Sequence, residues 1–215
     1  DVIDAILPLA PKINLVDIND TTNPTQEIEF YKNSIRPKDQ DLSTTVEDLL
    51  ANVKHQLKRL IQKHINEECG ISTAEDIIIN IQKQINLFKG EMEEEHELFK
   101  DKLPAIKQIV EIANNDLIEL EKKTFVFNKS SKKQGCIEEI VNAVMQEVLT
   151  EREIIRRREA LRFYNALNIY LLDELTHITN IKKSLINVNS QLTKLLIDTQ
   201  NRVGKVSKTF QIDLA

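Results

Sequence analysis

A run with neither glycine nor proline, from Ile137 to Val203, constrains the fold of this chain more than any other feature. Glycine and proline are the residues that most often end or break helices. Within the run, apolar residues recur at the three- and four-residue spacings of one helix face. A helix of roughly 67 residues would be about 100 Å long at 1.5 Å per residue. We therefore expect an elongated rod rather than a globule.

Two further helices are predicted before this run. Apolar positions between Val46 and Ile65 predict a helix that stops at Cys69–Gly70, where glycine can adopt the left-handed conformation. The sequence Ser72–Glu75 is a capping box, which predicts the start of a second helix, and this helix ends near residue 123. Pro104 lies inside the second helix, at a stutter in its heptad pattern, so we expect a kink or an interruption there.

The composition agrees with an all-α fold. The chain has four glycines, no tryptophan and 29% charged residues. Too few glycines are present for the turns of a β-sandwich or barrel, or for the glycine loops of a nucleotide-binding α/β fold. Aromatic residues make up only 5% of the chain, which indicates narrow aliphatic seams between helices.

The helix lengths predict an arrangement of these segments. A turn near residue 129 makes the second and third helices antiparallel. Residues 42–96 with 163–204 then form a three-helix body, and residues 97–162 project as a two-helix coiled-coil hairpin with a tip loop at 124–135. Four of the five prolines lie in residues 1–41, which we interpret as an extended, wrapping arm, and 205–215 as a tail.

Charge supports this register. An acidic run between Glu91 and Asp101 would face a basic run between Arg152 and Arg162. The proposed register pairs Glu97 with Arg162 and Asp101 with Arg158. Each exposed pair contributes only about 0 to 1 kcal/mol, so these pairs help to select the register of the hairpin more than they add to its stability. The alternative is that the two runs are unrelated solvated faces.

The tip loop is the most informative candidate site. Five lysines bracket three apolar residues there: Lys122, Lys123, Lys129, Lys132 and Lys133 around Phe125, Val126 and Phe127. Such a cluster suits an anionic membrane interface or an acidic protein surface, because lysines attract these surfaces and aromatic rings become buried. The alternative is that the rings plug the open end of the hairpin while the lysines keep the loop soluble.

Enzymatic chemistry is not expected. Glu93 with His96 and Glu174 with His177 repeat the Glu-x-x-His motif of di-iron bundles, but the predicted register separates them by roughly 20 Å. Neither a serine nucleophile motif, nor a phosphate-binding loop, nor zinc-spaced cysteines occur. Cys69 and Cys136 read as buried or half-buried thiols. We predict no catalytic residue, no metal and no cofactor.

Charge and hydropathy also bear on partners and location. A net charge of -5 argues against broad binding to nucleic acid, and glutamates interrupt the arginine run. We find no membrane-spanning stretch and no signal peptide, so the sequence reads as soluble while its compartment stays open.

The architecture is similar to that of coiled-coil scaffolds, helical pore-forming toxins and crescent-shaped membrane-bending domains, without a motif specific to any of them. We predict a non-enzymatic interaction module that binds a protein partner, or a second copy, through its rod surface or hairpin tip. The alternative is a membrane-active helical protein that uses the tip loop.

Overall fold

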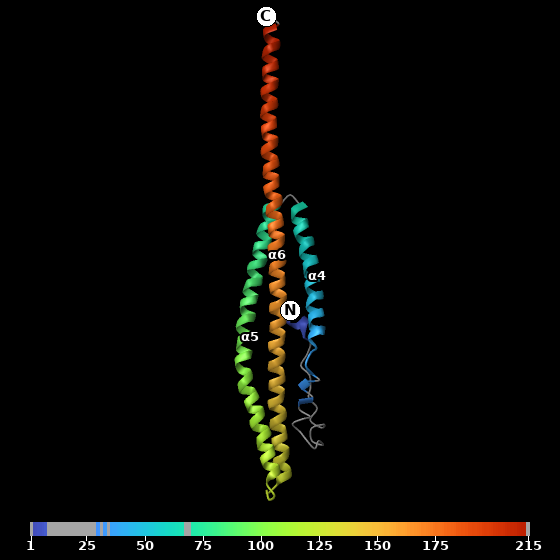
Figure 1. Cartoon of the computed structure of the whole chain (residues 1–215), viewed down its shortest axis with the longest axis vertical. Coiled ribbons are helices and arrows are strands. Elements are labelled where there is room, and N and C mark those ends of the chain that lie inside the picture. Colours follow the sequence, from blue (N-terminus) through green and yellow to red (C-terminus); the bar gives the residue numbers. More distant parts are fainter. Residues whose placement is uncertain (1, 8–28, 31, 34, 67–69, 214–215) are drawn as a thin grey trace. The chain divides into compact units, whose positions relative to one another are not determined.

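The computed structural model describes residues 2–7, 29–30, 32–33, 35–66 and 70–213 (Figure 1). Every regular element among them is a helix, which confirms the all-α class. The elements are α1 (Val2–Ile6), α4 (Asp39–Asn66), α5 (Gly70–Lys122) and α6 (Lys129–Asp213). The three long helices contain 28, 53 and 85 residues, so the helical periodicity of the sequence predicted their number correctly.

The predicted ends of the third helix are wrong. α6 begins at Lys129 and ends at Asp213, so only residues 123–128 remain as a loop and most of the predicted tail is helical. Both glycines in these stretches, Gly135 and Gly204, lie inside the helix. A helical glycine costs only about 1 kcal/mol relative to alanine, which a helix of this length tolerates.

The second helix also differs in detail. α5 runs from Gly70 to Lys122 through Pro104 without interruption, although an interior proline removes one backbone hydrogen bond. Gly70 opens α5 with a φ of 74°, in the left-handed region that favours glycine. Ser72 therefore lies inside the helix rather than at its cap.

The chain divides into two compact units. The first contains residues 1–55 and 83–167, and the second contains residues 56–82 and 168–215. These boundaries differ from the predicted ones at 96 and 162.

The core of the first unit is a narrow aliphatic seam between α5 and α6. Buried residues of α5 at Val110, Ala113 and Leu117 pack against a longer buried row on α6, which comprises Ile137, Ile140, Val141, Ala143, Val144 and Val148. Ion pairs join the two helices along this seam, with Glu121 to Lys133 at 2.9 Å, Lys107 to Glu151 at 3.3 Å and Glu95 to Arg157 at 2.7 Å. The partners' numbers rise on one helix as they fall on the other, as in an antiparallel hairpin.

The structure corrects the predicted ion pairs across this hairpin. Glu97 contacts Lys100, Arg162 contacts Glu159, and Arg158 contacts Glu159 and Asp39, while Asp101 makes no ion pair among the described residues. The pair that does form between the two charged runs is Glu95 with Arg157, whose guanidinium also lies 4.5 Å from the ring centroid of Phe99.

The observed register lies close to the predicted one without reproducing its pairs. The cross-helix pairs 95 with 157, 121 with 133 and 107 with 151 are centred on residues 126, 127 and 129, against a predicted centre of about 129. The turn is shorter than predicted, and burial of the aliphatic row fixes the register more strongly than exposed charges do.

The N-terminal segment packs against α6 in the first unit. Four ion pairs join it to α6, namely Asp4 to Arg156, Lys32 to Glu147, Arg36 to Glu151 and Asp39 to Arg158. Ile6 and Leu7 are buried. The described part of the predicted extended arm is therefore largely helical, and α1 ends just before Pro8, as expected for a residue that precedes proline. Residues 8–28 lie outside the described residues.

In the second unit, the first turns of α5 pack against α6. Ala74, Ile78, Leu171 and Ile178 are fully buried. Glu75 holds this contact by accepting hydrogen bonds from Lys182 at 2.6 Å and from Thr179 at 3.3 Å.

Candidate functional site at the hairpin tip

The loop that joins α5 to α6 is a tight turn of residues 123–128. Asn128 adopts a φ of 55°, which asparagine tolerates better than most residues, and its carbonyl accepts the first backbone hydrogen bond of α6 from Lys132 at 3.1 Å. The turn brings the end of α5 against the start of α6, so the side chains that begin α6 reach the last carbonyls of α5.

Two of the five lysines at the tip stabilise this turn. The Nζ of Lys129 donates to the backbone carbonyls of Glu121 at 3.1 Å and Lys123 at 2.7 Å. These carbonyls lie at the negative end of the α5 dipole, where a cation is favourable. Lys133 forms an ion pair with the Glu121 carboxylate at 2.9 Å. Sequence reasoning assigned both lysines to binding and missed this role, although lysines directly after a helix end are the signal for it.

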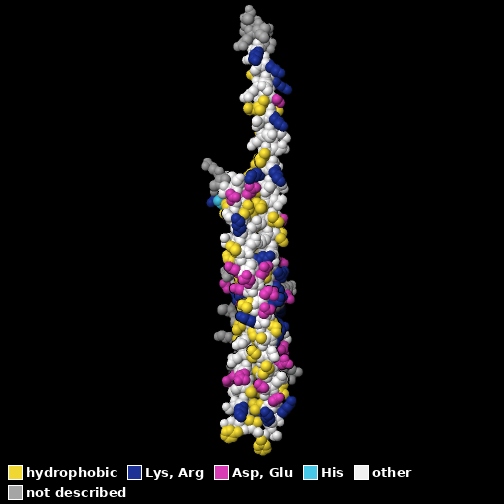
Figure 2. Space-filling view, turned by 90° about the vertical axis from the view of Figure 1, so that its left-hand side faces the viewer, with side chains coloured by type: hydrophobic (Ala, Val, Ile, Leu, Met, Phe, Trp, Pro, Cys, Tyr) yellow, Lys and Arg dark blue, Asp and Glu magenta, His cyan; other side chains and the backbone are white. Residues whose placement is uncertain are grey.

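The aromatic side chains of the loop project into solvent. Phe125 is 99% exposed and Phe127 is 86% exposed, while Val126 between them is half-buried. Figure 2 shows hydrophobic side chains at the end of the hairpin. Leu117 and Ile137 already close the seam beneath the loop, so the interpretation of the rings as a plug is wrong.

The other three lysines surround the rings as exposed charges. Lys122, Lys123 and Lys132 make no ion pair within the part of the chain that the structure describes. The tip therefore presents two aromatic rings and three exposed lysines without an ion pair, while Lys129 keeps its charge against the α5 carbonyls and Lys133 is neutralised by Glu121.

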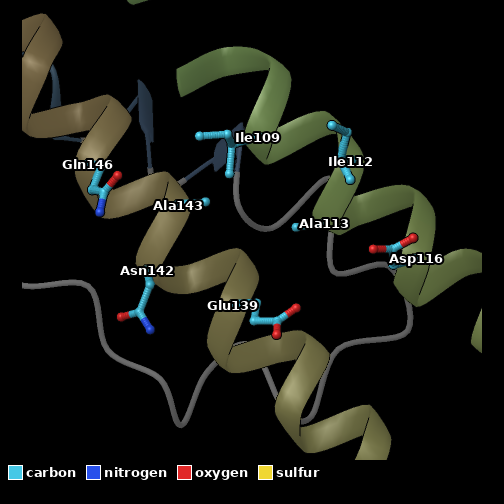
Figure 3. A pocket seen from close by; sticks show the side chains of 8 residues that line it. All are labelled: Ile109, Ile112, Ala113, Asp116, Glu139, Asn142, Ala143 and Gln146. Atoms are coloured by element: carbon cyan, nitrogen blue, oxygen red, sulfur yellow. The ribbon is translucent and has the colours of Figure 1, made fainter. Parts of the chain in front are cut away.

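A groove lies between α5 and α6 in the same unit (Figure 3). Its volume is about 410 Å³, and Ala113 and Ala143 form its small-residue floor. Ile109 and Ile112 line it from α5 and are each 52% exposed. The groove is completed by Asp116, Glu139, Asn142 and Gln146. Its chemistry suits an apolar side chain and offers no nucleophile.

The thiol of Cys136, which packs against the same seam, is held in its protonated form. Partial burial raises the pKa of the Cys136 thiol, and the carboxylates of Glu139 and Asp116 raise it further. At neutral pH the thiol is therefore protonated, and the protonated form is the poor nucleophile.

Neither a metal-ligand cluster nor a membrane-spanning helix occurs among the described residues. Within them, no group of three or more histidine, cysteine, aspartate or glutamate side chains is placed to hold a metal ion. Glu93 and His96 belong to the first unit, and Glu174 and His177 to the second. No described helix is both long enough and apolar enough to cross a membrane.

Comparisons of this chain with protein-family models, with curated proteins and with solved structures found no match.

Proposed function

Since no relative supplies a function, we propose from the geometry that this chain is a helical interaction module whose hairpin tip binds a partner protein. The observation that supports this most strongly is the exposure of Phe125 and Phe127 on a turn of defined conformation. Two large apolar rings in full contact with water have no role in the core, and exposed aromatic anchors are typical of binding surfaces.

The energetics favour the rings as the anchors of this site. Burying one phenylalanine contributes about 1.5 to 3 kcal/mol, so the pair offers about 3 to 6 kcal/mol before the costs of association. The contacts of Lys129 hold the turn in place, which reduces the entropy lost when a partner binds. The three unpaired lysines favour a partner with an acidic rim around its apolar pocket.

A protein partner fits these observations better than a membrane does. Two of the five lysines are held within the hairpin: Lys133 is neutralised by Glu121, and the ammonium group of Lys129 is turned onto the α5 carbonyls. Each lysine near an anionic lipid surface contributes about 1 kcal/mol to binding, so both contacts weaken the attraction of the tip to such a surface. A turn that fixes the spacing of two rings is suited to a shaped pocket, whereas insertion between lipids requires no fixed spacing.

The experiment is site-specific photo-crosslinking at position 125 in extracts of the source cells. We expect one discrete cross-linked protein that disappears when Phe127 is replaced by serine. The matched control carries the photo-reactive residue at Leu98, an exposed apolar position on α5 away from the tip. Equal products from both positions would contradict the proposal. Flotation with vesicles containing phosphatidylserine forms the second arm, and binding there without a protein cross-link would favour the membrane alternative.

A further inference from the structure

The last part of α6 carries an apolar stripe that nothing in the described chain covers. All residues from Lys183 to Lys208 are exposed. Within the second unit, Figure 1 shows α6 continuing past the last turns of α4 and the first turns of α5. Seven aliphatic side chains between 49% and 62% exposed share one side of the helix, namely Leu185, Val188, Leu192, Leu195, Leu196, Val203 and Val206.

This stripe continues a helix–helix interface that already exists in the second unit. Leu171 and Ile178 are fully buried where α5 packs on α6. Leu185 and Leu192 follow them at intervals of seven residues and occupy the same line on α6. The seam that α5 covers up to Lys182 therefore extends beyond the start of α5 with the same spacing and no cover.

The charges of this segment are arranged to permit contact between two identical helices. The residues that border the stripe include Ser184, Asn189 and Gln191, which are uncharged. Lys183, Lys194 and Lys208 lie on the side of the helix opposite the stripe. Like charges on or beside a seam would repel a second copy, and here they are confined to Arg202 near the C-terminal end of the stripe.

We propose that a second copy of this chain covers the stripe, so that residues 183–208 of two molecules form a homotypic coiled coil. Burying one such side chain removes roughly 100 Å² of apolar surface, which gives about 1,400 Å² for seven side chains on each of two copies. Specific interfaces bury about 1,200 to 2,000 Å² in total, so the stripe alone is large enough for a dimer.

The polar positions on the same seam limit the affinity. Thr199 and Arg202 fall where the pattern calls for apolar residues. Polar residues in a seam reduce stability while they select register and oligomeric state. We therefore expect association in the micromolar range and no higher-affinity complex.

Sedimentation equilibrium of the full chain tests this proposal over about 1 to 200 µM, a range that brackets micromolar dissociation constants. The wild type should shift from monomer to dimer across this range. The double variant Leu185→Asp with Leu192→Asp should stay monomeric, with an affinity loss of at least about 100-fold. Because both side chains are exposed in the monomer, these substitutions leave its packing intact.

The control variant, Ser190→Asp with Asn201→Asp, adds the same charge on the opposite side of the helix and should dimerise like the wild type. The tip variant Phe125→Ser with Phe127→Ser should also dimerise normally, which separates this proposal from the proposed function of the tip. A wild type that stays monomeric throughout would overturn the inference. So would a stripe variant that dimerises like the wild type, or a control that loses dimerisation.

Discussion

Removal of one member of the buried Lys32–Glu147 ion pair should destabilise the first unit strongly. The Nζ of Lys32 lies 2.5 Å from the Oε2 of Glu147, and both residues are buried, at 5% and 4% exposure. Replacing Glu147 with leucine leaves the buried lysine charge with only the exposed carboxylate of Glu29, at 3.2 Å, as its counter-ion. Breaking a buried pair outright costs about 3 to 5 kcal/mol, so with Glu29 still in place we expect a loss of about 2 to 3 kcal/mol.

The complementary single variant should cost a similar amount. When Lys32 is replaced by methionine, Glu147 keeps a second cation, because the Nζ of Lys107 lies 4.0 Å from its Oε1. We expect a loss of about 2 kcal/mol in the free energy of unfolding. The double variant removes both charges and should lie within about 1 kcal/mol of the wild type, since an apolar pair of similar volume replaces a buried ion pair at little cost.

The assay is equilibrium unfolding in urea followed by circular dichroism. The matched control is the exposed pair of Glu97 and Lys100, where Lys100→Met should change the free energy of unfolding by no more than about 0.5 kcal/mol. The reasoning is refuted if Glu147→Leu costs no more than Lys100→Met. It is also refuted if the double variant loses the sum of the two single losses.

Three further predictions concern other parts of the chain. Phe125→Ser with Phe127→Ser should change the free energy of unfolding in urea by about 0.5 kcal/mol or less, because both rings are exposed, and a larger loss would restore the plug interpretation. The hydrogen bond from Lys182 lowers the pKa of Glu75 below its ordinary value of 4.5, so Glu75→Gln should be less stable than the wild type at pH 7. This difference should vanish as the pH falls through the lowered pKa, and a difference that persists in acid would exclude the charge as its cause. Burial raises the pKa of Tyr170 to about 12, so the stabilising effect of the neutral phenol is present below pH 10 and is lost as the pH rises toward 12. An absorbance titration compared with that of Tyr170→Phe should show this late ionisation. Ionisation of Tyr170 near pH 10 would contradict the prediction.

The sequence predicted the helices well because its breakers and its periodicity act locally. The long interval without glycine or proline after Ile137 and the apolar spacing before Ile65 were sufficient to place three helices. The ends of α6 were misplaced because Gly135 and Gly204 are tolerated in a helix whose remaining residues favour it.

The register of the hairpin could not be predicted from charge. Many pairings of an acidic run with a basic run are nearly equal in free energy, since each exposed pair contributes so little. The register of the hairpin is set instead by burial of the aliphatic row on α6 and by the length of the turn. The turn is held by the contact between Lys129 and the carbonyls of Glu121 and Lys123, and a lysine directly after a helix end signals such a contact without fixing the number of residues in the turn.

The candidate site was predicted in position but not in detail. The residues of the tip were identified from the sequence. Whether the two phenylalanine rings enter the seam between α5 and α6 or project into solvent depends on Leu117 and Ile137, which already fill the seam beneath them. The buried pair of Lys32 and Glu147 was missed altogether, because Lys32 lies in a segment without periodicity and its partner is 115 positions away.

The exposure of the tip can be measured with a single fluorescent side chain, since the chain contains no tryptophan. Phe125→Trp places the only indole at the tip, and acrylamide should quench it in the folded chain as readily as in urea. Addition of the partner should shield the indole and shift its emission to the blue, and Phe127→Ser should abolish that change. An indole that is already shielded in the isolated, folded chain would contradict the claim that the tip is an open binding site.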